Sequence, residues 1–93
     1  MKQKKTIQER FEQFHEENPN VYDLVVKFSR QMANRRNQCG MKMIWERVRW
    51  ETAITTNDPE FKLNNNYTAH YARLVMRNEK DLEGFFKTRE LRA

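Results

Sequence analysis

Cysteine, glycine and proline are scarce in this chain, and each scarcity excludes a class of protein. The single cysteine, Cys39, has no partner for an internal disulfide or a thiol-rich zinc site, which indicates a reducing compartment. Two glycines and two prolines are too few for a turn-rich all-β chain. No apolar run approaches the ~20 residues of a membrane-spanning helix, and no apolar segment follows the basic residues 2–5 to make a signal peptide. We therefore expect a cytoplasmic protein with no membrane contact.

What the chain does contain suits one small helical domain. Of its 93 residues, 38% are hydrophobic and 33% are charged, which allows one modest core beneath a polar surface. The fold class that we predict is mainly α, a compact bundle of four to five helices. Residues 1–5 are predicted to be a disordered basic tail, and residues 6–93 to be a single helical domain.

Capping and periodicity place the helices. Thr6 and Glu9 form a capping box, and Asn18-Pro19 ends the helix that follows it. Phe61-Lys62-Leu63 alternates in polarity and predicts a short strand, which would make the bundle winged-helix-like. The predicted helices cover residues 6–17, 20–36, 41–54, 67–78 and 81–91.

The predicted helix over residues 41–54 has two apolar faces. Met41, Ile44, Trp45 and Val48 form one stripe, whereas Met43 and Trp50 lie on the other side. The cost of leaving tryptophan in water favours burial of this second face between neighbouring helices. The alternative is that Met43 and Trp50 face a partner, as interface anchors do.

Patterns for catalysis and for metal binding are weak. Glu12 and His15 lie at i, i+3, but two dispersed histidines and one cysteine give no metal-ligand spacing. The single serine and the cysteine lie in no nucleophile motif. Asp58, Glu60 and Lys62 contain an acid-x-Lys pattern, but this pattern needs a mixed sheet to hold Mg²⁺, and no such sheet is predicted. We expect no enzyme, no metal and no cofactor.

The predicted helix over residues 67–78 carries the best candidate binding surface. His70, Arg73 and Arg77 share one flank at i, i+3, i+7, and amide and hydroxyl side chains precede them at the helix start. Asparagine can pair with adenine and arginine with guanine in a DNA major groove. The predicted nucleic-acid-binding residues are Arg35, Arg36, Lys42, Asn64, Asn65, Asn66, Thr68, His70, Arg73 and Arg77.

Charge placement supports this hypothesis, although a plainer interpretation remains open. The net charge is +5. Between Leu24 and Trp50 there are seven basic residues and only one acidic residue, Glu46. Cations there could neutralise DNA phosphates. Alternatively, the asparagines cap a turn and the arginines form a solvated flank. The gap of residues 55–66 is also too long for a plain helix-turn-helix.

Three stretches resemble a family of small uncharacterised phage and prophage proteins. They are residues 11–22, which contain Phe-Glu-Gln-Phe-His, residues 44–52, which contain Ile-Trp-Glu-Arg-Val-Arg-Trp-Glu-Thr, and residues 61–73, which contain Phe-Lys-Leu-Asn-Asn-Asn-Tyr-Thr. The resemblance covers most of the chain from Phe11 to Arg92. It implies an origin in the cytoplasm of a phage-infected bacterium and brings no activity and no binding residues.

Two hypotheses of different kinds follow. The first is a non-catalytic phage-type DNA-binding protein that uses the predicted helix over residues 67–78. The second is a protein-interaction module, for example a phage factor that inhibits a host or defence protein, in which Met43 and Trp50, together with Phe85 and Phe86, form the interface. A phage assembly component that pairs with a second copy of itself is a variant of the second.

Overall fold

The computed structural model describes residues 6–58 and 61–86, and within them it is mainly helical. Four α-helices follow one another there, and two short 3-10 helices flank the fourth. Their bounds, in chain order, are α1 Ile7–Glu17, α2 Pro19–Ala33, α3 Met41–Thr55, η1 Asn65–Tyr67, α4 Thr68–Asn78 and η2 Lys80–Leu82. The predicted tail over residues 1–5 lies outside the described residues. No α-helix in the described ranges is long and apolar enough to cross a membrane.

The first two helices begin and end where local chemistry requires. The Glu9 amide donates to Thr6 Oγ1 and the Thr6 amide donates to Glu9 Oε1, both at 3.1 Å, which confirms the predicted capping box. Pro19 occupies the first position of α2, where its missing N–H costs nothing. α2 ends at Ala33, earlier than predicted, and the amides of Arg35 and Arg36 both donate to the Met32 carbonyl in the turn that follows.

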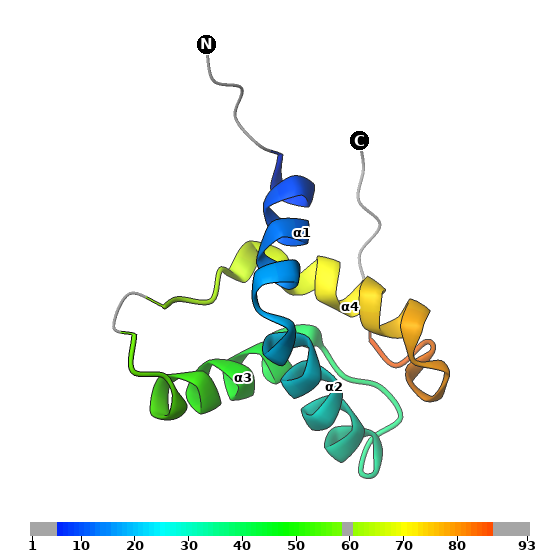
Figure 1. The fold of residues 1–93 in the computed structure, drawn as a ribbon. Coiled ribbons are helices and arrows are strands. Elements are labelled where there is room, and N and C mark those ends of the chain that lie inside the picture. The colour runs from blue at the N-terminus through cyan, green and yellow to red at the C-terminus, as the bar shows by residue number, and fades with distance from the viewer. Residues whose placement is uncertain (1–5, 59–60, 87–93) are drawn as a thin grey trace.

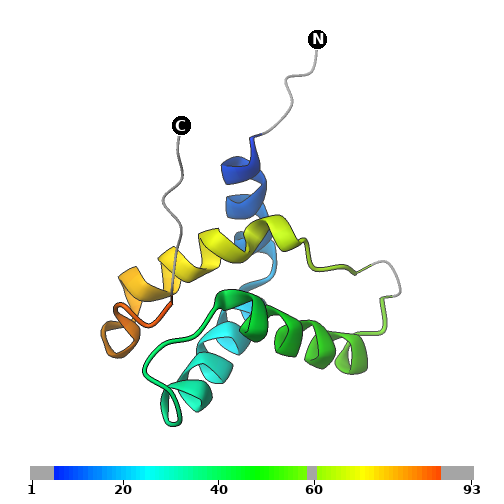
Figure 2. The ribbon, with the colours of Figure 1, turned by 180° about the vertical axis from the view of Figure 1, so that it is seen from behind.

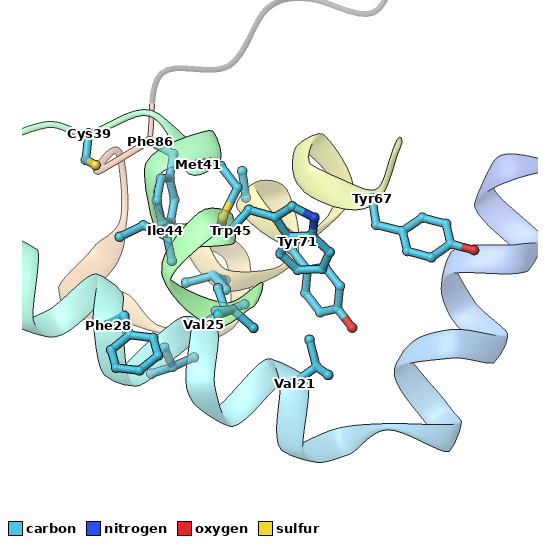
Figure 3. Packing of buried hydrophobic residues seen from close by; sticks show 14 of the residues in the cluster. Val21, Val25, Phe28, Cys39, Met41, Ile44, Trp45, Tyr67, Tyr71 and Phe86 are labelled. Carbon is cyan, nitrogen blue, oxygen red and sulfur yellow. The ribbon is translucent and has the colours of Figure 1, made fainter. Parts of the chain in front are cut away.

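The helices surround one core (Figures 1 and 2). α2 packs against α3, α4 runs across both, and α1 stands on the opposite side of α4 from the connection between α2 and α3. Trp45 of α3 and Tyr71 of α4 meet at the centre with their ring centroids 5.2 Å apart (Figure 3). Both side chains are fully buried, as are Val21 and Val25 of α2 below them.

The end of the described chain is fastened to α2 and to the connection that follows it. The Cys39 amide donates to the Phe85 carbonyl at 3.0 Å, beside an isolated parallel bridge between Cys39 and Phe86. Arg30 forms ion pairs with Glu79 at 2.7 Å and with Asp81 at 2.9 Å. The hydrogen bond from Arg30 lowers the pKa of the Asp81 carboxyl. These contacts hold η2 and Phe86 against the bundle.

Several predicted details at the two connections after α3 are wrong. Phe61–Leu63 forms no strand, so the described residues contain no wing. The helix predicted from Asp81 is limited to η2, because Gly84 at φ +75° turns the chain toward Cys39. Phe85 and Phe86 are buried, so they are core residues and not part of an interface. The predicted helix beyond Phe86 lies outside the described residues.

The buried phenol of Tyr71 makes stability sensitive to alkaline pH. Its hydroxyl contacts no hydrogen-bond partner among the described atoms, and burial raises the pKa of Tyr71. Above the ordinary tyrosine pKa of about 10, the unfolded chain loses a proton that the folded chain keeps, so the free energy of unfolding falls as pH rises. We predict that Tyr71→Phe flattens this fall, measured by urea denaturation between neutral and alkaline pH. An unchanged slope in the variant would contradict the burial of this phenol.

Candidate functional site

The outer face of α3 is apolar and uncovered in the described part of the molecule. Met43, Trp50 and Ile54 have relative exposures of 54%, 65% and 64%. The prediction that Met43 and Trp50 are buried is therefore wrong. At about 100° per residue, Trp50 lies about 140° around the helix from Trp45, and Met43 about 160°. α2 and α4 both pack on the Trp45 side, and α2 borders the opposite face only at its edge, where Arg47 lies over Phe28.

This face forms one wall of a groove between α2 and α3, with a volume of about 580 Å³. Phe28 and Ile44 are buried beneath it, Met32 is half-buried, and Met43 and Trp50 stand exposed at its edge. The groove is lined by Phe28, Gln31, Met32, Arg35, Met43, Ile44, Glu46, Arg47 and Trp50. It combines an apolar base with a polar and mainly cationic border.

The acid that lines the groove has an ion-pair partner, whereas the arginines that line it have none among the described residues. Glu46, the only acid that lines it, is paired with Arg49, which also donates to Asn65 Oδ1 and, at 3.3 Å, to the Leu63 carbonyl. The Arg47 guanidinium lies over the Phe28 ring at 4.6 Å and makes no ion pair with a described carboxylate. Cations at the groove therefore lack internal partners, whereas its carboxylate has one.

The side chains of Asn64 and Asn65 and the backbone amide of Asn66 serve local structure. Asn64 Oδ1 accepts from the Asn66 amide at 2.8 Å and caps η1, and Asn65 Oδ1 accepts from Arg49. Thr68 Oγ1 donates to the Asn65 carbonyl at 3.1 Å. The capping alternative is therefore confirmed for Asn64, and Asn65 ties the start of α4 to α3.

His70, Arg73 and Arg77 do line one surface, as their spacing predicted. They border a small hollow with Gln8 and Phe11 of α1. His70 does not project freely into solvent, because it is half-buried against Phe11 with ring centroids 5.1 Å apart. Arg73 and Arg77 are exposed, and Arg73 Nε donates only to the Ala69 carbonyl of its own helix.

The cationic corner of Arg35, Arg36 and Lys42 lies elsewhere. Arg35 lines the α2–α3 groove, and the other two are exposed at the connection between α2 and α3 and at the start of α3. Both views place this connection on the far side of α4 from α1 (Figures 1 and 2). The two sets of predicted DNA-binding residues therefore lie on separate surfaces.

Reactive groups are few in the described ranges. No group of three His, Cys, Asp or Glu side chains there is arranged to hold a metal ion. His15 packs against Phe11, Tyr22 and Tyr71, with centroid distances of 6.0, 5.3 and 5.9 Å. Burial raises the pKa of the Cys39 thiol, although the nearby Arg36 opposes this. Neither group is placed as a nucleophile or ligand. Glu60, of the acid-x-Lys pattern, lies outside the described residues.

Sequence analysis missed the contribution of α2 to the groove. Phe28, Gln31 and Met32 were not among the predicted site residues. The available signal was a matched spacing, since residues 28, 31, 32 and 35 repeat the i, i+3, i+4, i+7 pattern of residues 43, 46, 47 and 50. In each set two residues are apolar and two are polar, which is the pattern of a helix face at the edge of the core.

Comparison of the chain with protein-family models, with curated proteins and with solved structures found no match in any of the three.

Proposed function

We propose that the protein is a non-catalytic module that binds a partner protein in the groove between α2 and α3. The exposure of Trp50 beside Met43 is the observation that carries this proposal. Burial of a large apolar side chain is favourable by about 1.5–3 kcal/mol, and a bound partner would provide that burial. Tryptophan, methionine and arginine are enriched at protein interfaces, and all three border this groove.

The dimensions of the groove suit a short segment better than a broad flat contact. Its two walls each extend over about two helical turns. A stable interface between globular proteins buries about 800 Å² on each side, which requires surface beyond such a groove. In this proposal the groove holds the anchoring segment of its partner, and the resemblance to phage proteins suggests a bacterial host protein as that partner.

We predict that Trp50→Ala abolishes capture of the partner while the fold is retained. The matched control is Ile54→Ala, because Ile54 is equally exposed on α3 but does not line the groove. Nuclease-treated bacterial lysate is passed over the immobilised wild type and both variants, and the captured proteins are identified. Proteins retained by wild type and Ile54→Ala, but lost from Trp50→Ala, support the proposal.

Equal capture by all three proteins would exclude the groove as the binding site. Surface substitutions usually change stability by less than about 0.5 kcal/mol, so both variants are expected to unfold at the wild-type urea concentration. A large loss of stability in Trp50→Ala would instead mean that Trp50 is part of the core.

Nucleic-acid binding by α4 is a second candidate function. It is favoured by Arg73 and Arg77, which line one hollow with His70 and make no ion pair with a described carboxylate. Such cations are available to neutralise phosphates. In this form the hypothesis no longer requires Arg35, Arg36 and Lys42 on the same face.

Salt dependence tests this candidate. If Arg73 and Arg77 each contact a phosphate, the negative slope of log K against log salt becomes shallower by about 0.9 for each arginine replaced by glutamine. The test variant is Arg73→Gln with Arg77→Gln. The control is Arg35→Gln with Arg47→Gln, which removes the same charge from the other surface. Fluorescence anisotropy with a labelled duplex gives the slopes. Absence of binding at low salt, or equal slopes in the two double variants, would exclude DNA binding by α4.

A further inference from the structure

We infer that the occupant of the α2–α3 groove is an amphipathic helix of a partner protein that carries carboxylates beside its apolar face. This inference rests on the proposed function and specifies the chemistry of the partner. Three observations support it: the spacing of the residues that line the groove, the absence of described carboxylate partners for its arginines, and the net positive charge of the chain.

The spacing of the lining residues matches a helical ligand. From α2 and the turn after it, the groove takes residues 28, 31, 32 and 35, and from α3 it takes residues 43, 46, 47 and 50 together with the buried Ile44. Each set extends over eight residues, or seven steps of 1.5 Å, which is about 10 Å. A helix with apolar residues at i, i+3, i+4 and i+7 presents an apolar stripe of the same length. Its stripe would lie against Met32, Met43 and Trp50, beside the Arg47 guanidinium that covers the Phe28 ring.

The charges of the groove select an acidic partner. Arg35 and Arg47 line it without a described carboxylate partner, and Glu46 is already paired with Arg49. Because Arg47 is held over the Phe28 ring, its guanidinium is oriented before any partner arrives. Carboxylates that flank the apolar stripe of a bound helix can form charge-assisted hydrogen bonds with these arginines.

The same charges disfavour the two other occupants of such a groove. A second copy of this chain, with its net charge of +5, would bring matching arginines together. A single-stranded nucleic acid binds through successive aromatic platforms, whereas Trp50 is the only exposed aromatic residue that lines the groove and Arg47 covers Phe28. An acidic helix satisfies both the apolar and the cationic parts.

Designed peptides test the inference directly. Each labelled probe has about 16 residues, enough for marginal helix formation in water. The first has leucine and phenylalanine at i, i+3, i+4 and i+7 with glutamates on both flanks. The second replaces the glutamates with lysines, and the third scrambles the acidic sequence so that the apolar stripe is lost. A thymidine oligonucleotide serves as the fourth probe, and binding to the full chain is followed by anisotropy.

The expected result is a preference that reverses with charge. Wild type should bind the acidic amphipathic probe at least about tenfold more tightly than the lysine and scrambled probes. Arg35→Glu with Arg47→Glu should reverse the preference between the acidic and lysine probes. Trp50→Ala, introduced into wild type or into the double variant, should weaken binding of the preferred probe by more than about tenfold, since the anchor is lost. Arg35→Glu alone, which disturbs no described hydrogen bond, should reduce the preference even if the double variant fails to fold.

The contradicting outcomes separate this inference from the proposed function. Equal binding of the acidic and lysine probes, with both lost in Trp50→Ala, would overturn the acidic partner and leave the protein-binding groove intact. Binding of no amphipathic probe, or binding unaffected by Trp50→Ala, would overturn both. Trp50-dependent binding of the oligonucleotide would assign the groove to nucleic acid, and a wild-type dimer that Trp50→Ala dissociates in sedimentation would assign it to a second copy.

Discussion

The contact between Trp45 and Tyr71 determines how α3 is turned, and the exposed surface depends on it. The two rings meet at 5.2 Å in the centre of the bundle, where both are fully buried. Once Trp45 points inward, helix geometry directs Met43, Trp50 and Ile54 outward within a narrow arc. α3 therefore buries one apolar face, and Met43, Trp50 and Ile54 on the other face remain largely exposed to solvent. The groove is a direct consequence of this rotation.

The groove and the α1–α4 hollow differ in the kind of ligand that they suit. The groove has buried aromatic and aliphatic side chains at its base and arginines at its edge. The hollow is smaller and bordered mainly by polar and cationic groups, with His70 resting on Phe11. Apolar anchors give affinity in protein contacts, whereas cations alone support weaker and salt-sensitive contacts with polyanions. For this reason protein binding is the better supported function.

Local chemistry was predictable from the sequence, whereas the choice between two faces was not. The capping box at Thr6, the break at Pro19 and the shared flank of His70, Arg73 and Arg77 depend on neighbours within one or two helical turns. The two apolar faces of α3 were also recognisable, but which face is buried depends on how many helices pack around it. The position of His70 against Phe11 and the turn at Gly84 toward Cys39 depend likewise on contacts between segments distant in sequence.

The central claim is that Trp45 is inside the core and Trp50 is outside it, and tryptophan fluorescence tests this most directly. Trp50→Phe leaves Trp45 as the only indole, and Trp45→Phe leaves only Trp50. The account predicts blue-shifted emission with little acrylamide quenching in Trp50→Phe. It predicts solvent-like emission with strong quenching in Trp45→Phe, provided that circular dichroism shows the helices intact. Shielded emission from Trp50 in a monomeric, folded protein would contradict the exposed groove on which the proposals rest.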